Sequence, residues 1–234
     1  MIRRVLHIAS LSFCALAMVG FAGRDSADVV TTDPSLPPVV GAYLTPAQVH
    51  ADYSGPGLQI VLSQIQHQPF AGQGTIVQRH SDASGNETEI FGSSATGMVS
   101  VNGSPDVPIN ATGPVTTEVF GKVGNVTGTF NTEMLQLDLS GNTPFGPMMI
   151  RESPTLASTG QTTITDIGGG QYRISSFFDI FTELSVDGGA SWIPQNNGPT
   201  HVVLTDTSVP LPAALPAGLG LLGLLIVGRR RRAV

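Results

Sequence analysis

The stretch Leu135-Gln136-Leu137-Asp138-Leu139 alternates leucine with polar residues. A period of two is typical of a β-strand with one face on a core and the other in water, so we expect the three leucines to share the buried face. Similar short runs recur along the chain and are separated by Gly, Asn, Asp and Pro, which favour turns. They occupy residues 58–62, 115–120, 126–130, 162–167, 172–186 and 201–205.

The region around these runs lacks an apolar stripe with helical spacing that lasts three turns, so helix should be minor. About ten strands in roughly 165 residues without helical crossovers favour antiparallel pairing, hence a sandwich or a barrel. We predict an all-β fold, an antiparallel β-sandwich of about ten strands. Asp187-Gly188-Gly189 is the clearest hairpin signal, because Asp-Gly pairs tolerate the positive φ of a tight turn.

The composition excludes two classes of protein. The 234 residues are only 12% charged, include 28 Gly and 17 Pro, and have a formal net charge of -6. A solvated disordered chain would carry more charge, and a protein that binds nucleic acid would be basic, so no nucleic-acid partner is expected. The length suits one domain of about 150 residues with appendages.

The N-terminus has the pattern of a secretory signal peptide, with Arg3 and Arg4 before an apolar stretch. We predict a signal peptide over residues 1–22 with cleavage after Ala22; cleavage after Ala27 is the alternative. The single cysteine, Cys14, lies within this segment, so the mature chain would have no disulfide and no thiolate.

The C-terminus combines a proline motif, an uncharged stretch over residues 211–228 and a basic tail. Eighteen residues make a helix of ~27 Å, which can just span a bilayer, so we predict a single transmembrane helix. The tail should stop transfer and remain in the cytoplasm. A plain anchor and a segment cut by a membrane protease or transpeptidase both fit. The motif is Val209-Pro210-Leu211-Pro212-Ala213, and the tail is Arg229, Arg230, Arg231 and Arg232.

These three features together resemble the PEP-CTERM class of bacterial sorting signals, in the variant written V-P-L-P-A. The resemblance covers residues 209–234 and implies processing by an exosortase in bacteria that make exopolysaccharide. It also implies anchoring in the inner membrane before processing, followed by a location at the cell surface or outside the cell. The stretch from Arg151 to Trp192 resembles a segment of other exported bacterial proteins and implies only export and a β fold.

The chain therefore divides into four parts. They are the signal peptide at 1–22, an extended proline-rich lead-in at 23–46, an exported β domain at 47–208 and the sorting signal at 209–234. Residues 23–208 hold five of the eleven basic residues and all seventeen acidic ones, so this region has a net charge of -12.

We expect no set of residues placed for catalysis and no cofactor. His50, His67, His80 and His201 have no metal-binding spacing and are predicted to lie at the surface or rim. Glu87 and Glu89 would be ~7 Å apart on one strand face, within the range of paired glycosidase acids. They flank a polar turn, however, so a solvated edge is the preferred interpretation.

Two weaker binding sites are considered. Asp82, Ser84 and Asn86 alternate as the oxygen ligands of a calcium loop do, but the third acidic ligand is missing, so a hairpin turn is favoured. Trp192 and Tyr172 are candidate contacts for a glycan.

The leading functional hypothesis is an exported, non-catalytic protein of the cell surface or extracellular matrix. A module that binds carbohydrate, here exopolysaccharide, is the second. A secreted hydrolase is the third, and it would require Glu87, Glu89 or Glu152 to line a closed pocket near another carboxylate.

Overall fold

The computed structural model describes residues 28–70 and 77–207. The predicted signal peptide, its cleavage site at Ala22 and the sorting signal at 209–234 lie outside the described residues.

Within the described residues the chain forms fourteen strands that belong to one sheet, and no α-helix. This part of the chain accordingly offers no helix that could cross a membrane. The prediction of an all-β fold is confirmed. The strands are β1 (Asp28–Thr31), β2 (Ala42–Leu44), β3 (His50–Gly55), β4 (Leu58–Pro69), β5 (Gln78–Ser81), β6 (Glu87–Val101), β7 (Val107–Val119), β8 (Gly128–Thr143), β9 (Gly146–Glu152), β10 (Ser158–Gly168), β11 (Gln171–Ile180), β12 (Thr182–Ser185), β13 (Ile193–Pro194) and β14 (Thr200–Thr205).

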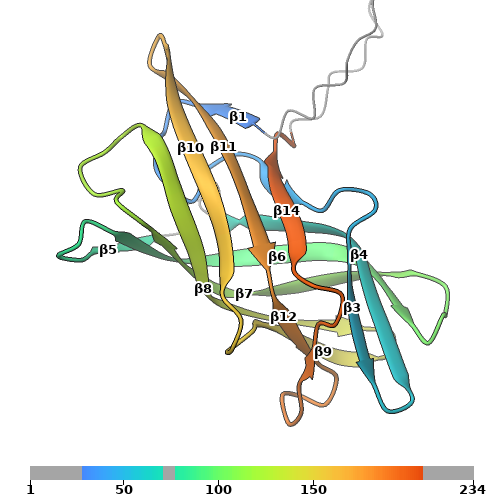
Figure 1. The fold of residues 1–234 in the computed structure, drawn as a ribbon. Helices are drawn as coiled ribbons and strands as arrows, with labels where there is room; N and C mark the ends of the chain where they lie inside the picture. The colour runs from blue at the N-terminus through green and yellow to red at the C-terminus, as the bar shows by residue number, and fades with distance from the viewer. Residues whose placement is uncertain (1–27, 71–76, 208–234) are drawn as a thin grey trace, which may run out of the picture.

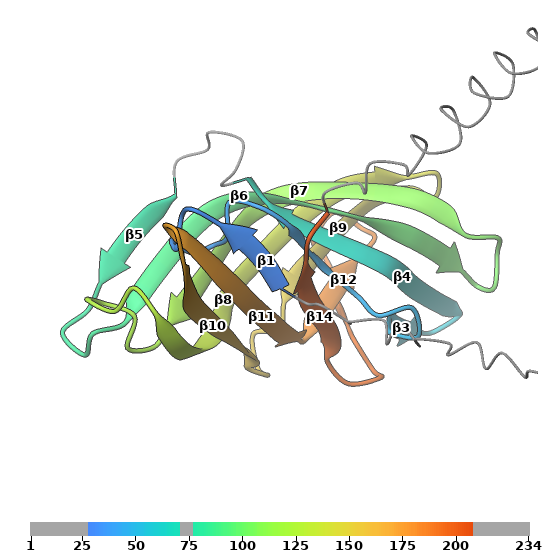
Figure 2. The same ribbon diagram turned by 90° about the horizontal axis from the view of Figure 1, so that it is seen from above.

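The sheet closes on itself as an eight-stranded antiparallel barrel in the order β11-β14-β2-β4-β6-β7-β8-β10, where β10 returns to β11. Figure 2 shows β4, β6 and β7 along one side of this barrel and β10, β11 and β14 along the other. The prediction of a sandwich is wrong. A sandwich would leave the edges of its two sheets open, whereas here β8 pairs with β10 and closes the sheet. This pairing runs from Met134 opposite Ser158 to Gly128 opposite Ile164.

The long strand β8 also extends the barrel beyond this ring. Its second half pairs with β9, which pairs with β12, which pairs with β13 (Figure 1). An isolated bridge between Tyr53 and Gln195 then connects this extension to β3. The run predicted over residues 172–186 is therefore divided between β11 and β12, and each half has different neighbours.

A β-bulge changes the direction of the leucines in β8. Thr116 pairs with Gln136 and Thr117 with Met134, so Leu135 is the extra residue between two pairs. Leu137 and Leu139 are buried, whereas Leu135 is 45% exposed. The prediction that all three leucines share the buried face is wrong for Leu135, because a bulge reverses the inward and outward positions on either side of it.

The proline-rich residues before position 47 belong to the barrel. β1 pairs with β11 and β2 pairs with β14 and β4, so residues from Asp28 onward already belong to the sheet. Leu36, Pro37 and Pro38 are buried. At Gly41, where φ is 82°, an added Cβ would lie 2.6 Å from a Val29 methyl carbon and 2.8 Å from the Thr205 carbonyl oxygen. The described part of the predicted lead-in therefore contributes β1, a packed loop and β2 to the sheet.

The hairpin predicted at Asp187-Gly188-Gly189 is confirmed, because Leu184 of β12 pairs with Ile193 of β13. Its loop is longer than a two-residue turn. Hydrogen bonds from the hydroxyl and amide of Ser191 and from the hydroxyl of Ser185 hold the Asp187 carboxylate and lower its pKa to about 2.

Candidate functional site

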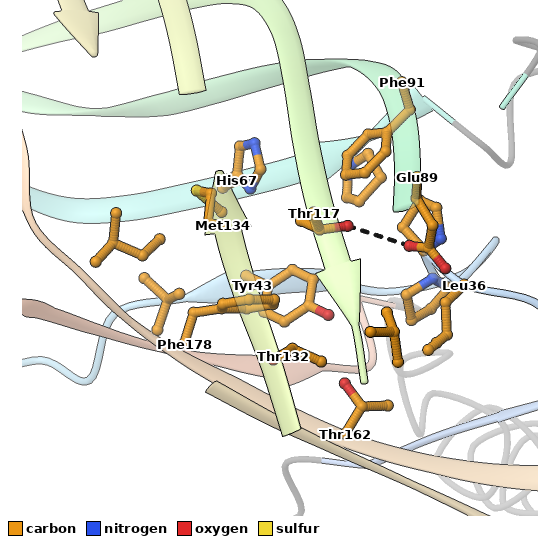
Figure 3. Close-up of a pocket in the computed structure, with 16 residues that line it drawn as sticks. Leu36, Tyr43, His67, Glu89, Phe91, Thr117, Thr132, Met134, Thr162 and Phe178 are labelled. Carbon is orange, nitrogen blue, oxygen red and sulfur yellow. Dashed lines mark hydrogen bonds between the residues drawn. The ribbon is translucent and has the colours of Figure 1, made fainter. Parts of the chain in front are cut away.

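A cavity lies inside the barrel and is lined in part by Leu36, Pro37 and Pro38 of the loop between β1 and β2; Figure 3 shows Leu36 and other residues that line it. Its volume is about 20 Å³, which is room for about one water molecule. Apolar side chains such as Phe91, Met134 and Phe178 form much of the wall. Six polar side chains also line it, from β2, β4, β6, β7, β8 and β10: Tyr43, His67, Glu89, Thr117, Thr132 and Thr162.

Glu89 is the buried acidic group of this cavity, with 1% of its surface exposed. The Thr117 hydroxyl donates a hydrogen bond to its Oε2 (3.2 Å), whereas Oε1 has no hydrogen-bond partner among the described residues. Burial, reinforced by the charge of Glu87, raises the pKa of Glu89 to about 8, so the carboxyl is mainly protonated at neutral pH. The prediction of a solvated edge is wrong for Glu89, because β6 turns Glu89 and Phe91 inward together.

His67 is buried at 6% exposure, and its Nε2 has no hydrogen-bond partner within the described part of the chain. Burial lowers its pKa to about 4, so the ring is neutral. The surface or rim position predicted for it is wrong because of a register shift in β4 between Ser63 and Gln66. Ile60 and Leu62 face inward before this shift, and His67 and Pro69 face inward after it.

The other polar groups of the cavity are hydroxyls. Tyr43 donates to Ser176 Oγ (3.0 Å), which lies 2.7 Å from Thr162 Oγ1. Burial raises the pKa of Tyr43, so this network is uncharged. Thr132 Oγ1 is buried and, within the described residues, has no partner. Counting partners among the described residues alone, the cavity therefore has three unpartnered polar side-chain atoms, on Glu89, His67 and Thr132.

The outer end of the cavity is closed by Leu36, Pro37 and Pro38, which we call the plug. Arg79 of β5 holds it, since Nε and Nη2 donate to the Leu36 carbonyl oxygen at 3.1 and 2.6 Å. Glu87 is also near, with its Oε1 3.8 Å from Arg79 Nε. In Figure 3, Leu36 lies next to Glu89 and His67 lies on the opposite side of the cavity.

A second cavity of about 60 Å³ lies beyond His67, toward Tyr53 and Thr182. His67, Ile180 and Val202 line both cavities, so these three side chains separate them. The lining of the second cavity is largely apolar and includes Leu137 and Leu139.

The arrangement required by the hydrolase hypothesis is present for Glu89, which lines a closed cavity with the Glu87 carboxylate nearby. A space for about one water, closed by the plug, cannot admit a sugar in this conformation. Glu152 does not line this cavity. It accepts a hydrogen bond from the Ser158 hydroxyl (3.1 Å), and burial raises its pKa.

The two predicted glycan contacts are not brought together. Trp192 lies beside β9 and β12, and the Arg151 guanidinium covers its ring at 4.1 Å while donating to Glu183 at 2.6 Å. Tyr172 lies at the start of β11, opposite Thr31 of β1, at the other end of the molecule (Figure 1).

The residues of the weak calcium candidate form the turn between β5 and β6. Asp82 Oδ1 accepts hydrogen bonds from the amides of Ser84 and Asn86, both at 2.8 Å, and Oδ2 accepts one from the Asn86 side chain. The carboxylate therefore stabilises the hairpin turn. In residues 28–70 and 77–207, no group of three or more His, Cys, Asp or Glu side chains is placed to hold a metal ion.

A scan against protein-family models, a search of curated proteins and a search of solved structures each found no match to this chain.

Proposed function

We propose that this chain is an exported, non-catalytic protein of the cell surface or extracellular matrix, processed through its C-terminal sorting signal. The observation that carries the proposal is the ordered combination of Val209-Pro210-Leu211-Pro212-Ala213, an apolar stretch and four arginines at the end of the chain. A signal-peptide pattern at the N-terminus is consistent with it. The partner is an exosortase-type enzyme, and the apolar stretch at 211–228 anchors the chain until it is cut.

The barrel fits a structural or adhesive role. Its interior is filled by side chains except for small cavities, and the deepest acidic group, Glu89, is sealed from solvent. The net charge of -12 over residues 23–208 favours solubility outside the cell and attraction of cations to the surface.

The test is mass spectrometry of the mature protein from a bacterium that has an active exosortase. We expect a C-terminus near Pro212, and an uncleaved chain for Pro212→Ala. Pro216→Ala is the matched control, because it changes a proline outside the motif and should be cut normally. An intact C-terminus in the unmodified protein would reduce the motif to a plain anchor.

A second candidate function is binding of exopolysaccharide on the outer face of β8, β10 and β11. The observation that favours it is a row in register across these strands: Asn131, Gln161 and Phe177. The Gln161 amide donates to Asn131 (3.2 Å), and the Phe177 ring lies 5.5 Å from the ring of His201. Sites for small ligands commonly combine an aromatic ring with a few placed polar groups such as side-chain amides.

This candidate is tested by gel retardation of the protein in exopolysaccharide. Phe177→Ala should abolish the retardation, whereas Trp192→Phe should leave it unchanged because Arg151 already covers the Trp192 ring. The absence of retardation with the unmodified protein would eliminate this function.

A further inference from the structure

Arg79 lies within reach of two different acceptors at the mouth of the barrel. In the register of β5 and β6 it is directly opposite Glu89, and the side chains of directly opposite residues point to the same face of a sheet. Its guanidinium nevertheless bonds to the Leu36 carbonyl, while Glu89 Oε1 remains buried without a partner among the described residues.

In the described part of the chain, the cation that acts on Glu89 is Arg79. The titratable or charged groups that face it are Tyr43 from β2, His67 from β4, Arg79 from β5 and Glu87 from β6, with Asp33 in the loop near Arg79. β7, β8 and β10 present the hydroxyls of Thr117, Thr132 and Thr162. Because His67 is neutral and Tyr43 is protonated, Arg79 is the group that can neutralise an ionised Glu89.

We propose that residues 32–41 are a proton-controlled closure of the barrel, in which Arg79 binds the Leu36 carbonyl while Glu89 is protonated and turns to the Glu89 carboxylate when that proton is lost. In the closed state the plug covers the cavity. In the open state Leu36 has lost both hydrogen bonds from Arg79, the plug separates from the barrel, and water reaches the cavity.

Two features of the site support this exchange. A buried carboxylate without a counter-charge is strongly unfavourable, and the nearby Glu87 adds repulsion, so ionisation requires either Arg79 or water. Arg79 is able to move, because its side chain is 35% exposed and its contact with Glu87 is long, at 3.8 Å. Glu89 has a pKa of about 8, which places the opening between about pH 7 and pH 9.

The experiment is hydrogen exchange of the full chain followed by mass spectrometry at pH values from 6 to 9, corrected for the intrinsic exchange rate. Peptides that cover residues 32–41 should lose protection by at least about tenfold over this range, while peptides from β10 and β11 keep theirs. Glu89→Gln, which cannot ionise, should keep residues 32–41 protected at every pH. Arg79→Gln should leave them unprotected at every pH.

Glu133→Gln is the matched control, because Glu133 does not line the cavity, and it should behave as the unmodified protein does. Persistent protection of residues 32–41 at pH 9 would overturn the proposal. The proposal would also be overturned if protection of residues 32–41 depended on pH equally in the unmodified protein and in Glu89→Gln. A loss of protection in β10 and β11 together with the loss in residues 32–41 would overturn it as well. The comparison of peptides within the unmodified protein gives a result even if a variant fails to fold.

Discussion

Glu89 and His67 have pKa values shifted in opposite senses relative to the unfolded chain. Burial raises the pKa of Glu89 from 4.5 to about 8 and lowers that of His67 from 6.5 to about 4. The folded protein holds the Glu89 proton over pH values at which the unfolded chain releases it, so stability is lost as the pH rises from 4.5 to 8. For His67 the unfolded chain takes up a proton first, so stability is lost as the pH falls from 6.5 to 4.

These two effects predict the pH profile of stability. Between pH 4.5 and 6.5 they cancel, and from pH 6.5 to 8 the Glu89 effect alone should lower the free energy of unfolding by about 2 kcal/mol. In Glu89→Gln the decrease above pH 6.5 should disappear, and stability should instead rise from pH 4 to 6.5 and then stay constant. Urea unfolding at each pH measures both profiles, and a parallel decrease above pH 6.5 in the variant would contradict the assignment.

At Gly113 the strands β7 and β8 approach too closely for any side chain. An added Cβ would lie 1.8 Å from the Asp138 carbonyl oxygen, which is backbone and cannot rotate away. Gly113→Ala should therefore destabilise the barrel by about 3 kcal/mol or more in urea unfolding. Gly55→Ala is the control, because the nearest atom to its Cβ would be a flexible Ile193 methyl at 3.7 Å, and it should change stability by less than about 1 kcal/mol.

At the scale of elements, short strands extend one end of the barrel and depend on side-chain hydrogen bonds. β3, β12 and the Gln195 that follows β13 meet at Thr182, whose hydroxyl lies 2.6 Å from the Tyr53 hydroxyl and donates to Gln195 Oε1 at 3.0 Å. Tyr53 is 1% exposed, so its hydroxyl is inaccessible to water. These side-chain bonds add to the backbone contacts among the same segments, which include the pairing of β12 with β13, the bridge between Tyr53 and Gln195, and a hydrogen bond from the Gln195 amide to the Thr182 carbonyl oxygen (2.9 Å).

Tyr53→Phe should therefore lower the free energy of unfolding by about 1 to 2 kcal/mol, because it removes one buried hydrogen bond without leaving a large cavity. Tyr172→Phe is the matched control, since the Tyr172 hydroxyl makes no hydrogen bond within the described residues, and it should be neutral within about 0.5 kcal/mol. Thermal unfolding followed by circular dichroism measures both, and equal effects would show that the contact at Thr182 contributes nothing.

At the scale of the whole molecule, acidic residues far outnumber basic ones, with a net charge of -12 over residues 23–208. Few ion pairs offset this excess in the described residues, and the closest of them, between Arg151 and Glu183, is 2.6 Å long. Repulsion among the remaining carboxylates opposes the compact state, and salt screens that repulsion.

The melting temperature should therefore rise by about 2 to 5 °C when NaCl is increased from 10 to 200 mM at pH 7. KCl at the same ionic strength serves as the control and should have the same effect, because screening does not distinguish the two cations. A melting temperature that is constant or falls with salt would show that the excess of acidic residues does not limit stability.

Local patterns were sufficient to predict several features of this protein. Alternating residues indicated the strands, and the Asp187-Gly188-Gly189 sequence indicated the hairpin between β12 and β13. The same reasoning could not predict that Glu89 is buried. Glu89 and the neighbouring Ile90 lie on opposite faces of the strand, and the sequence does not show which of the two faces points into the barrel. Composition likewise could not separate a flexible linker from the packed plug, since both are rich in proline.

The sequence by itself determined the all-β character, the turns and the motif that predicts sorting, because each depends on residues that are neighbours in the chain. Only the tertiary structure decided that the sheet closes, that Glu89 and His67 meet in one cavity, and that Leu36 covers it. Closure depends on the pairing of Gly128 with Ile164, and burial of His67 depends on a register shift in β4. Both are contacts between distant segments, so their free energy exists only when the whole barrel has formed.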